Sequence, residues 1–210
     1  MKRVPRKNAV RLVLLFAAVG MSNNSLDGYL VRGSSQEELI DWDKVKSAFR
    51  DYLTEPVPEK AKAFLDILPF EGTKNQTGDR STAVLYIYDN YLTFEAGVLA
   101  GDKYLTEAAF RLLNFSDAAF SEVLDEILGN LATENPRLFL EVLYEYKESW
   151  FVKQVRPPVL GTSFEDLCGD ILQWKRRIKA LKTVKETKYR QIRDECIRLL
   201  EEAIEKYEPK

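Results

Sequence analysis

The sequence contains no histidine and only two cysteines. The lack of histidine excludes Ser-His and Cys-His nucleophile pairs, histidine general bases and nearly all catalytic zinc sites. Two cysteines alone cannot complete a structural zinc site. Glycine-rich phosphate loops, the G-x-S-x-G motif and EF-hand loops are also missing from the sequence. These absences predict a protein that is not an enzyme and that uses no metal or cofactor.

The hydrophobic run near the amino end is short. It extends over ten residues without a charge, Leu12 to Met21, whereas a membrane-spanning helix needs about 20 apolar residues. Five basic residues precede this run, and Ala18 and Gly20 supply small side chains near its end. This order is typical of a secretory signal peptide. We therefore expect residues 1–20 to be cleaved and residues 21–34 to form a flexible lead-in.

Two alternatives to cleavage remain for this segment. It could be retained as a signal-anchor that holds an extracytoplasmic domain at the membrane, or it could be an ordinary first helix. Cleavage would change the charge of the protein, because residues 1–20 hold five of the 31 basic residues and none of the 33 acidic ones. The remaining 26 basic and 33 acidic residues give a net charge of −7 in place of −2. We expect an exported (periplasmic or secreted) acidic protein, for which general nucleic-acid binding is disfavoured.

Both cysteines lie on apolar stripes with helical spacing, Cys168 in residues 164–181 and Cys196 in residues 189–207. Each is 14 residues from Lys182. If the chain reverses there, an antiparallel hairpin places both cysteines level with each other, about 20 Å from the turn, and a disulfide between them is feasible. Two free, buried cysteines are one alternative. The other is a single continuous helix, which would hold them about 42 Å apart.

The periodicity of the rest of the chain predicts an all-α fold built from antiparallel helical pairs, with a C-terminal helical hairpin. Ser35 and Glu38 form a capping box that opens a helix through Leu53, and Pro58 begins a short helix. Further helices are expected at 103–114, after a cap at Ser116, and after Asn135-Pro136. A polar loop (70–81) and a Pro/Gly loop (150–163) interrupt them. We expect a helical domain over 35–149, with the hairpin (164–207) packed on it.

The stretch between residues 82 and 99 fits two structures. As a helix it has one apolar face that includes Val84, Tyr88, Tyr91 and Phe94, and it ends at Gly101. As a β-hairpin it would turn at Asp89-Asn90. Since the elements that follow are helical, we favour the helix.

Helix starts near 81, 103, 116 and 136 place corresponding helices about 33–35 residues apart, a period typical of stacked helical pairs. The segment "LGNLATENPRLFLEVL" has leucines at helical spacing on both sides of an Asn-Pro break. Residues 81–149 therefore resemble HEAT-type α-solenoid repeats. The resemblance implies stacked helical pairs and carries over no functional residue, and an irregular helical bundle would give nearly the same pattern.

A basic cluster stands out in the C-terminal segment between residues 175 and 193, where Glu186 is the single acid until Asp194. Its members are Lys175, Arg176, Arg177, Lys179, Lys182, Lys185, Lys188, Arg190 and Arg193. We expect an interaction patch for an acidic partner protein or another acidic surface. The alternative is the solvated end of a helical hairpin. Contact with a membrane is expected only if the N-terminal segment is retained.

A run of carboxylates, Glu122, Asp125 and Glu126 near Glu134, is the remaining candidate for chemistry. Paired carboxylates can hydrolyse glycosidic bonds, but the outer face of an amphipathic helix also explains these residues. The sequence therefore predicts an exported helical protein that acts as a protein-binding or scaffold module. A carboxylate hydrolase and a signal-anchored extracytoplasmic domain are the alternatives.

Overall fold

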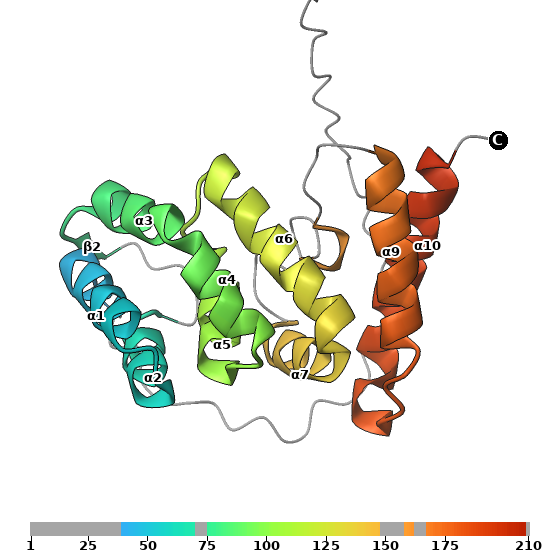
Figure 1. Ribbon diagram of the computed structural model, residues 1–210, viewed down its shortest axis with the longest axis horizontal. Coiled ribbons are helices and arrows are strands. Elements are labelled where there is room, and N and C mark those ends of the chain that lie inside the picture. Colours follow the sequence, from blue (N-terminus) through green and yellow to red (C-terminus); the bar gives the residue numbers. More distant parts are fainter. Residues whose placement is uncertain (1–38, 70–74, 148–157, 162–166, 209–210) are drawn as a thin grey trace, which may run out of the picture. The chain divides into compact units, whose positions relative to one another are not determined.

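Helices make up almost all of the regular structure (Figure 1). The computed structural model describes residues 39–69, 75–147, 158–161 and 167–208, without the side chains of residues 167 and 168. All of these residues belong to one unit, Gln36–Lys210. The signal peptide, the lead-in and the capping box at Ser35 lie outside the described residues. Within them, no helix combines the length and hydropathy that crossing a bilayer requires.

The described residues contain nine α-helices, which confirms the all-α prediction. They are α1 (Trp42–Thr54), α2 (Pro58–Asp66), α3 (Arg80–Asp89), α4 (Tyr91–Leu99), α5 (Lys103–Leu112), α6 (Ala118–Glu134), α7 (Pro136–Tyr146), α9 (Leu167–Leu181) and α10 (Arg190–Tyr207). The other regular elements of the described residues are two short 3-10 helices, η1 (Pro158–Leu160) and η2 (Thr187–Tyr189), and two two-residue strands, β1 (Ile40–Asp41) and β2 (Gln76–Thr77).

Side-chain caps explain where many of these helices begin. An aspartate or asparagine precedes five of them and accepts hydrogen bonds from first-turn amides, which otherwise have no partner within the helix. These caps are Asp41, Asp79, Asp102, Asp117 and Asn135. Pro58 and Pro136 each occupy the first helical position, where the missing N–H costs nothing.

The predicted start of the first helix is wrong. Residues 40–41 pair in parallel with 76–77 as β1 and β2, and Asp41 then caps α1, which begins at Trp42. Leu39, which lies before β1, is 62% exposed, whereas Trp42 is fully buried. The Trp42 indole N–H donates to Oε1 of Gln76 at 3.0 Å. The expected loop 70–81 contributes β2 and the first two residues of α3, Arg80 and Ser81.

The stretch 82–99 is helical, as favoured, but it forms two helices instead of one. Asn90 ends α3 and begins α4, because its side-chain amide donates to the carbonyl oxygen of Tyr86 at 2.8 Å and its backbone leaves helical geometry. At the other end of α4, Gly101 has a φ of +92°. The amides of Gly101 and Asp102 donate to the carbonyls of Val98 and Gly97, which is the Schellman pattern. The stop predicted at Gly101 is confirmed.

Helix α6 packs against α4, α5, α7 and α9, and α5 also packs against α7 (Figure 1). The helix starts at residues 80, 103, 118 and 136 agree with the expected ones to within two residues, but α4 adds another start at residue 91. This extra helix interrupts a regular two-helix repeat. The resemblance to HEAT repeats stays a prediction.

The C-terminal segment is a helical hairpin. Helices α9 and α10 lie side by side (Figure 1), and residues 182–189 join them. A single continuous helix is therefore wrong for this segment. Helix α9 packs against α6 and α7, and α10 also contacts α7. Ion pairs between Lys175 and Glu208 (2.7 Å) and between Lys182 and Glu201 (3.5 Å) link the two helices on their solvent-facing side.

Candidate functional site

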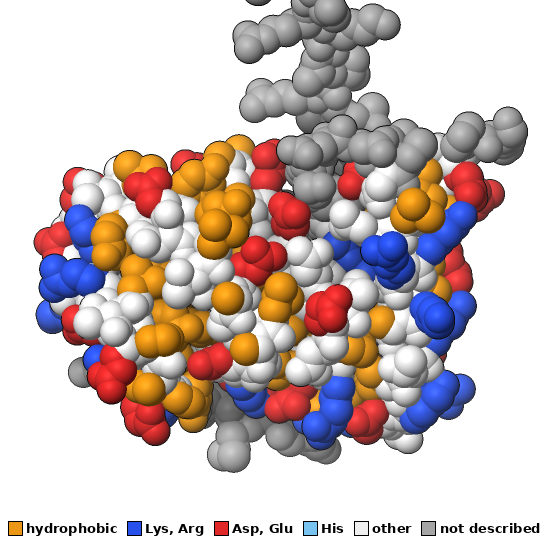
Figure 2. Space-filling model, viewed as in Figure 1, with side chains coloured by type: hydrophobic (Ala, Val, Ile, Leu, Met, Phe, Trp, Pro, Cys, Tyr) orange, Lys and Arg blue, Asp and Glu red, His pale blue; other side chains and the backbone are white. Residues whose placement is uncertain are grey.

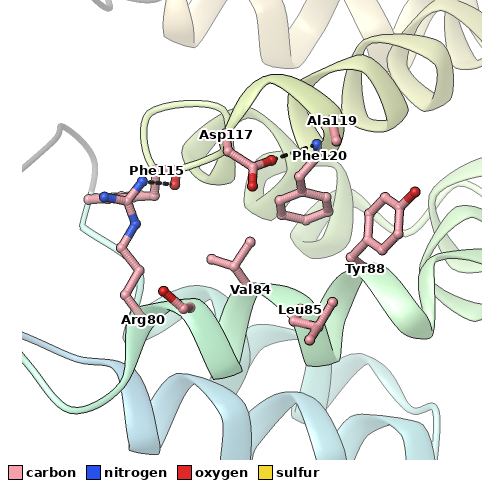
Figure 3. Close-up of a pocket in the computed structure, with 9 residues that line it drawn as sticks. Arg80, Val84, Leu85, Tyr88, Phe115, Asp117, Ala119 and Phe120 are labelled. Carbon is pink, nitrogen blue, oxygen red and sulfur yellow. Dashed lines mark hydrogen bonds between the residues drawn. The ribbon is translucent and has the colours of Figure 1, made fainter.

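A cavity of about 380 Å³ opens between α3 and the first turn of α6 (Figure 3). Its lining residues are Arg80, Ser81, Val84, Leu85, Tyr88, Phe115, Asp117, Ala119 and Phe120. Residues three or four apart share one face of a helix, so Arg80, Val84 and Tyr88 face the cavity together from α3. The opposite wall comes from the start of α6 and from the residues that precede it. We call this cavity the α3–α6 notch.

The charged groups of the notch are engaged at its rim. The Arg80 guanidinium donates to the carbonyl oxygen of Phe115 and lies over the Trp42 ring, 6.0 Å from its centroid. Asp117 accepts the backbone N–H of Phe120 at 2.9 Å as the cap of α6 (Figure 3). Valine, leucine and aromatic side chains form most of the remaining wall. The notch is therefore suited to an apolar side chain with a polar group next to it.

Exposed hydrophobic side chains continue from the notch along the helices. Seven large hydrophobic residues are exposed in the described part of the chain, and four of them lie between residues 85 and 92: Leu85, Tyr88, Tyr91 and Leu92. We call these four the α3–α4 surface. The Tyr88 ring packs edge-on against Phe120, with 6.2 Å between centroids, and lies 6.2 Å from the Tyr91 ring. Figure 2 shows hydrophobic side chains gathered where α3 and α6 approach each other.

The sequence pattern missed this surface. The expected helical face is correct for Val84 and Phe94, which are buried, but Tyr88 and Tyr91 on the same predicted face are each 36% exposed. The break at Asn90 changes the helix direction between the two tyrosines, so one continuous stripe cannot describe both helices. Leu85 and Leu92 are apolar but lie outside that stripe. Apolar residues outside a predicted buried face were the signal that could have revealed the surface.

A second, wider cleft of about 860 Å³ lies beside α4 and the start of α5. Its small floor residues include Ala96, Gly97 and Ala100, and its rim includes Lys103 and Glu107. This cleft adjoins a network of charged groups that joins α5 to α7.

Lys103 is the centre of that network. Its Nζ lies 2.8 Å from Glu141, 3.5 Å from Glu145 and 3.9 Å from Glu107. The hydrogen bond from Lys103 lowers the pKa of Glu141. Burial, followed by the negative charge of Glu145, raises the pKa of Glu107. Because the same lysine holds carboxylates from both helices together, the network ties α5 to α7.

The predicted carboxylates do not meet in either cleft. Glu122 and Glu134 are exposed on α6, Asp125 and Glu126 are partly buried on it, and none of the four lines the notch or the wider cleft. Within the described residues, no group of three or more acidic or cysteine side chains is placed to hold a metal ion.

The predicted basic patch is wrong for one of its members, Arg177. Arg177 is fully buried, and its guanidinium donates to the carbonyl oxygens of Val159 and Gly161. The other eight lie toward solvent to different degrees: Lys175, Arg176, Lys179, Lys182, Lys185, Lys188 and Arg190 are exposed, and Arg193 is half-buried.

The predicted disulfide is not formed in the structure: Cys196 is a buried, free thiol, and the side chain of Cys168 lies outside the described residues. Burial raises the pKa of Cys196 to about 12. A thiol with such a pKa is not a reactive nucleophile at neutral pH. The bond between these two cysteines in the native compartment stays a prediction.

Comparison of the chain with protein-family models, with curated protein sequences and with solved structures finds no significant match in any of the three.

Proposed function

We propose that this protein is a partner-binding module, and that it binds another protein through the α3–α6 notch and the adjoining α3–α4 surface. The observation that supports the proposal is the concentration of exposed hydrophobic side chains: of the seven found among the residues that the structure describes, four lie within residues 85–92, beside a cavity. Contiguous exposed apolar area is uncommon on monomeric proteins and often marks an interaction site.

The size of the notch favours a protein side chain as its occupant. A cavity of about 380 Å³ is at the small end of the range of roughly 300–1,000 Å³ for ligand sites. It has room for one or two aromatic or aliphatic side chains of a partner, and a few buried anchors of this kind dominate many interfaces. The hydroxyl groups of Tyr88 and Tyr91 at the edge of such a contact could hydrogen-bond to the partner backbone.

Export is part of the proposal and is supported by the N-terminal pattern of basic residues, a short apolar run and small residues. The intact mass of the protein from its native host tests it. We expect a mass that lacks residues 1–20. A mass that includes Met1 would contradict cleavage, and membrane association of that full-length species would favour the signal-anchored alternative.

Site-specific photo-crosslinking in the native host tests the binding surface. A photoreactive residue at Leu85, which is 56% exposed, is compared with the same residue at Ala63, which is exposed on α2 and belongs to neither proposed surface. We expect a discrete adduct from position 85 that is absent from position 63. A second substitution, Leu92→Ser, should weaken that adduct because it removes apolar area from the same surface.

The same experiment can overturn the proposal. Equal adduct ladders at both positions would indicate non-specific collisions. An adduct of twice the mass of the chain would indicate self-association, and no adduct at either position would leave the surface without a partner. Each of these results contradicts a dedicated protein-binding role for the α3–α4 surface.

A further inference from the structure

The solvent-facing side of α9 carries charge of one sign. Its exposed charged residues are Lys175, Arg176 and Lys179, whereas Asp170 is buried. Leu172, Arg176 and Lys179 are at positions i, i+4 and i+7, so they form one row along the helix. Figure 2 shows Lys and Arg side chains over α9, on the right of the view. We call the row of Leu172, Arg176 and Lys179 the outer edge of α9.

The charge of the outer edge is not balanced from within the hairpin. On the side toward α10, Lys175 pairs with Glu208 and Lys182 pairs with Glu201. Arg176 and Lys179, on the other side, form no ion pair in the part of the chain that the structure describes. The row also includes Leu172, whose side chain is 58% exposed.

Three acidic residues of α10, Asp194, Glu195 and Glu202, are engaged with bases of their own helix. Arg198 lies between Glu195 and Glu202, at 2.5 Å from each, and Asp194 pairs with Arg193 at 2.6 Å. A second copy of this chain would therefore have to break existing ion pairs in order to offer these carboxylates to the outer edge of α9.

We propose that the outer edge of α9 binds an acidic amphipathic helix of a partner protein. The row is one helix wide, and its seven-residue span covers about 10 Å. A partner helix with carboxylates at i and i+3 or i+4 would present charges at the same spacing, and an apolar residue at its end would cover Leu172. This pattern of an apolar contact flanked by opposite charges is the one that pairs helices in coiled coils.

A broad anionic surface fits the outer edge less well. Glu201 and Glu208 lie beside the row, bound to Lys182 and Lys175. A bilayer or a nucleic-acid duplex that covered the row would also approach these carboxylates, and like charges repel. A single acidic helix laid along Arg176 and Lys179 avoids this contact.

The test uses the full chain and a fluorescent helical peptide of about 20 residues, long enough to be helical in water, with glutamates at i, i+4 and i+7 and one leucine. Binding is measured by anisotropy at low salt. The variant Arg176→Glu/Lys179→Glu is compared with Lys44→Glu/Arg50→Glu, which changes the net charge equally on α1. We expect at least about a tenfold loss of affinity in the α9 variant, equivalent to about 1.4 kcal/mol, and little change in the α1 variant.

Several results would overturn this inference. An equal loss in both variants would mean that net charge alone attracts the peptide, and equal binding of a peptide with glutamine at the same positions would exclude charge recognition. The two substitutions could also weaken binding to phosphatidylserine vesicles or to duplex DNA. If that loss exceeds the loss of peptide binding, the partner of the outer edge is a bilayer or a nucleic acid and not an acidic helix. Failure of the peptide to bind at all would end the proposal. None of these outcomes bears on the α3–α4 surface, which is at other residues.

Discussion

The guanidinium of Arg177 lies directly against the backbone of α6 at Gly129. A Cβ atom on residue 129 would be 2.5 Å from Nη2 and 2.6 Å from Cζ of Arg177. The side chain is fully buried and donates to the carbonyl oxygen of Val159 at 2.9 Å. Because these bonds fix the guanidinium, it cannot move away from α6 without losing them.

Gly129→Ala should therefore destabilise the protein. Alanine in place of glycine within a helix normally stabilises it by up to about 1 kcal/mol. Here the new methyl group would displace a hydrogen-bonded guanidinium, and overpacking of this kind costs about 1–3 kcal/mol. The free energy of unfolding from urea denaturation measures the effect. The same substitution in an Arg177→Met background should be much less costly, since the obstructing group is gone, and an equal cost in both backgrounds would contradict the contact.

Replacing Arg177 itself should have a larger effect than replacing its neighbour. Arg177→Met leaves two buried carbonyl oxygens, those of Val159 and Gly161, without their charged donor, and such losses cost about 3 kcal/mol. Arg176→Met, one residue earlier and exposed, should change the free energy of unfolding by less than about 0.5 kcal/mol. Equal effects of both substitutions would show that Arg177 does not hold α6, α9 and η1 together.

The ends of several helices followed from local patterns. The stop at Gly101 and the cap at Asn135 act within a few residues. The sequence therefore predicts where α4 ends and where α7 begins. The start of α1 did not follow from such a pattern, because it depends on the pairing of Ile40 with Gln76, 36 residues apart. The spacing of apolar residues along the sequence does not indicate which distant residues contact each other.

The interaction surfaces were predictable only in part. The basic residues of α9 were identified from composition, but Arg177 was assigned to solvent because a charged side chain is almost never fully buried without partners. Its partners are the carbonyls of Val159 and Gly161, in the irregular connection before α9. The α3–α4 surface depends on the direction change at Asn90, which a single helical stripe does not contain.

Cys196 should be unreactive toward thiol reagents in the folded protein. Burial raises its pKa from 9.0 to about 12, so at pH 8 the folded thiol is neutral and covered, whereas the unfolded thiol is partly ionised. Alkylation by iodoacetamide should follow the rate of unfolding and be complete only in denaturant. Rapid modification of Cys196 in the native protein would contradict the burial, and a mass two hydrogens lower without reductant would show the bond to Cys168.

The same thiol should make stability depend on alkaline pH. A folded pKa above the unfolded one means that the neutral form stabilises the fold, fully below pH 9 and progressively less as pH rises toward 12. The free energy of unfolding should therefore fall over that window. Tyrosines and lysines titrate there too, so the control is Cys196→Ala, in which the fall should be shallower. Equal slopes for both proteins would exclude a contribution from this thiol.

Gly101 should be sensitive to substitution for a reason different from that of Gly129. Its φ is +92°, and the nearest atom to an added Cβ is Nδ2 of Asn135 at 3.5 Å, an ordinary contact. Space is therefore available, and the cost of Gly101→Ala lies in the backbone conformation, at about 1–2 kcal/mol. Gly101→Asn should cost less, since asparagine tolerates left-handed geometry better than alanine. Thermal and urea unfolding of both variants would test this order. A loss of stability that grows with side-chain size would show instead that steric contact, and not backbone geometry, restricts the residue at position 101.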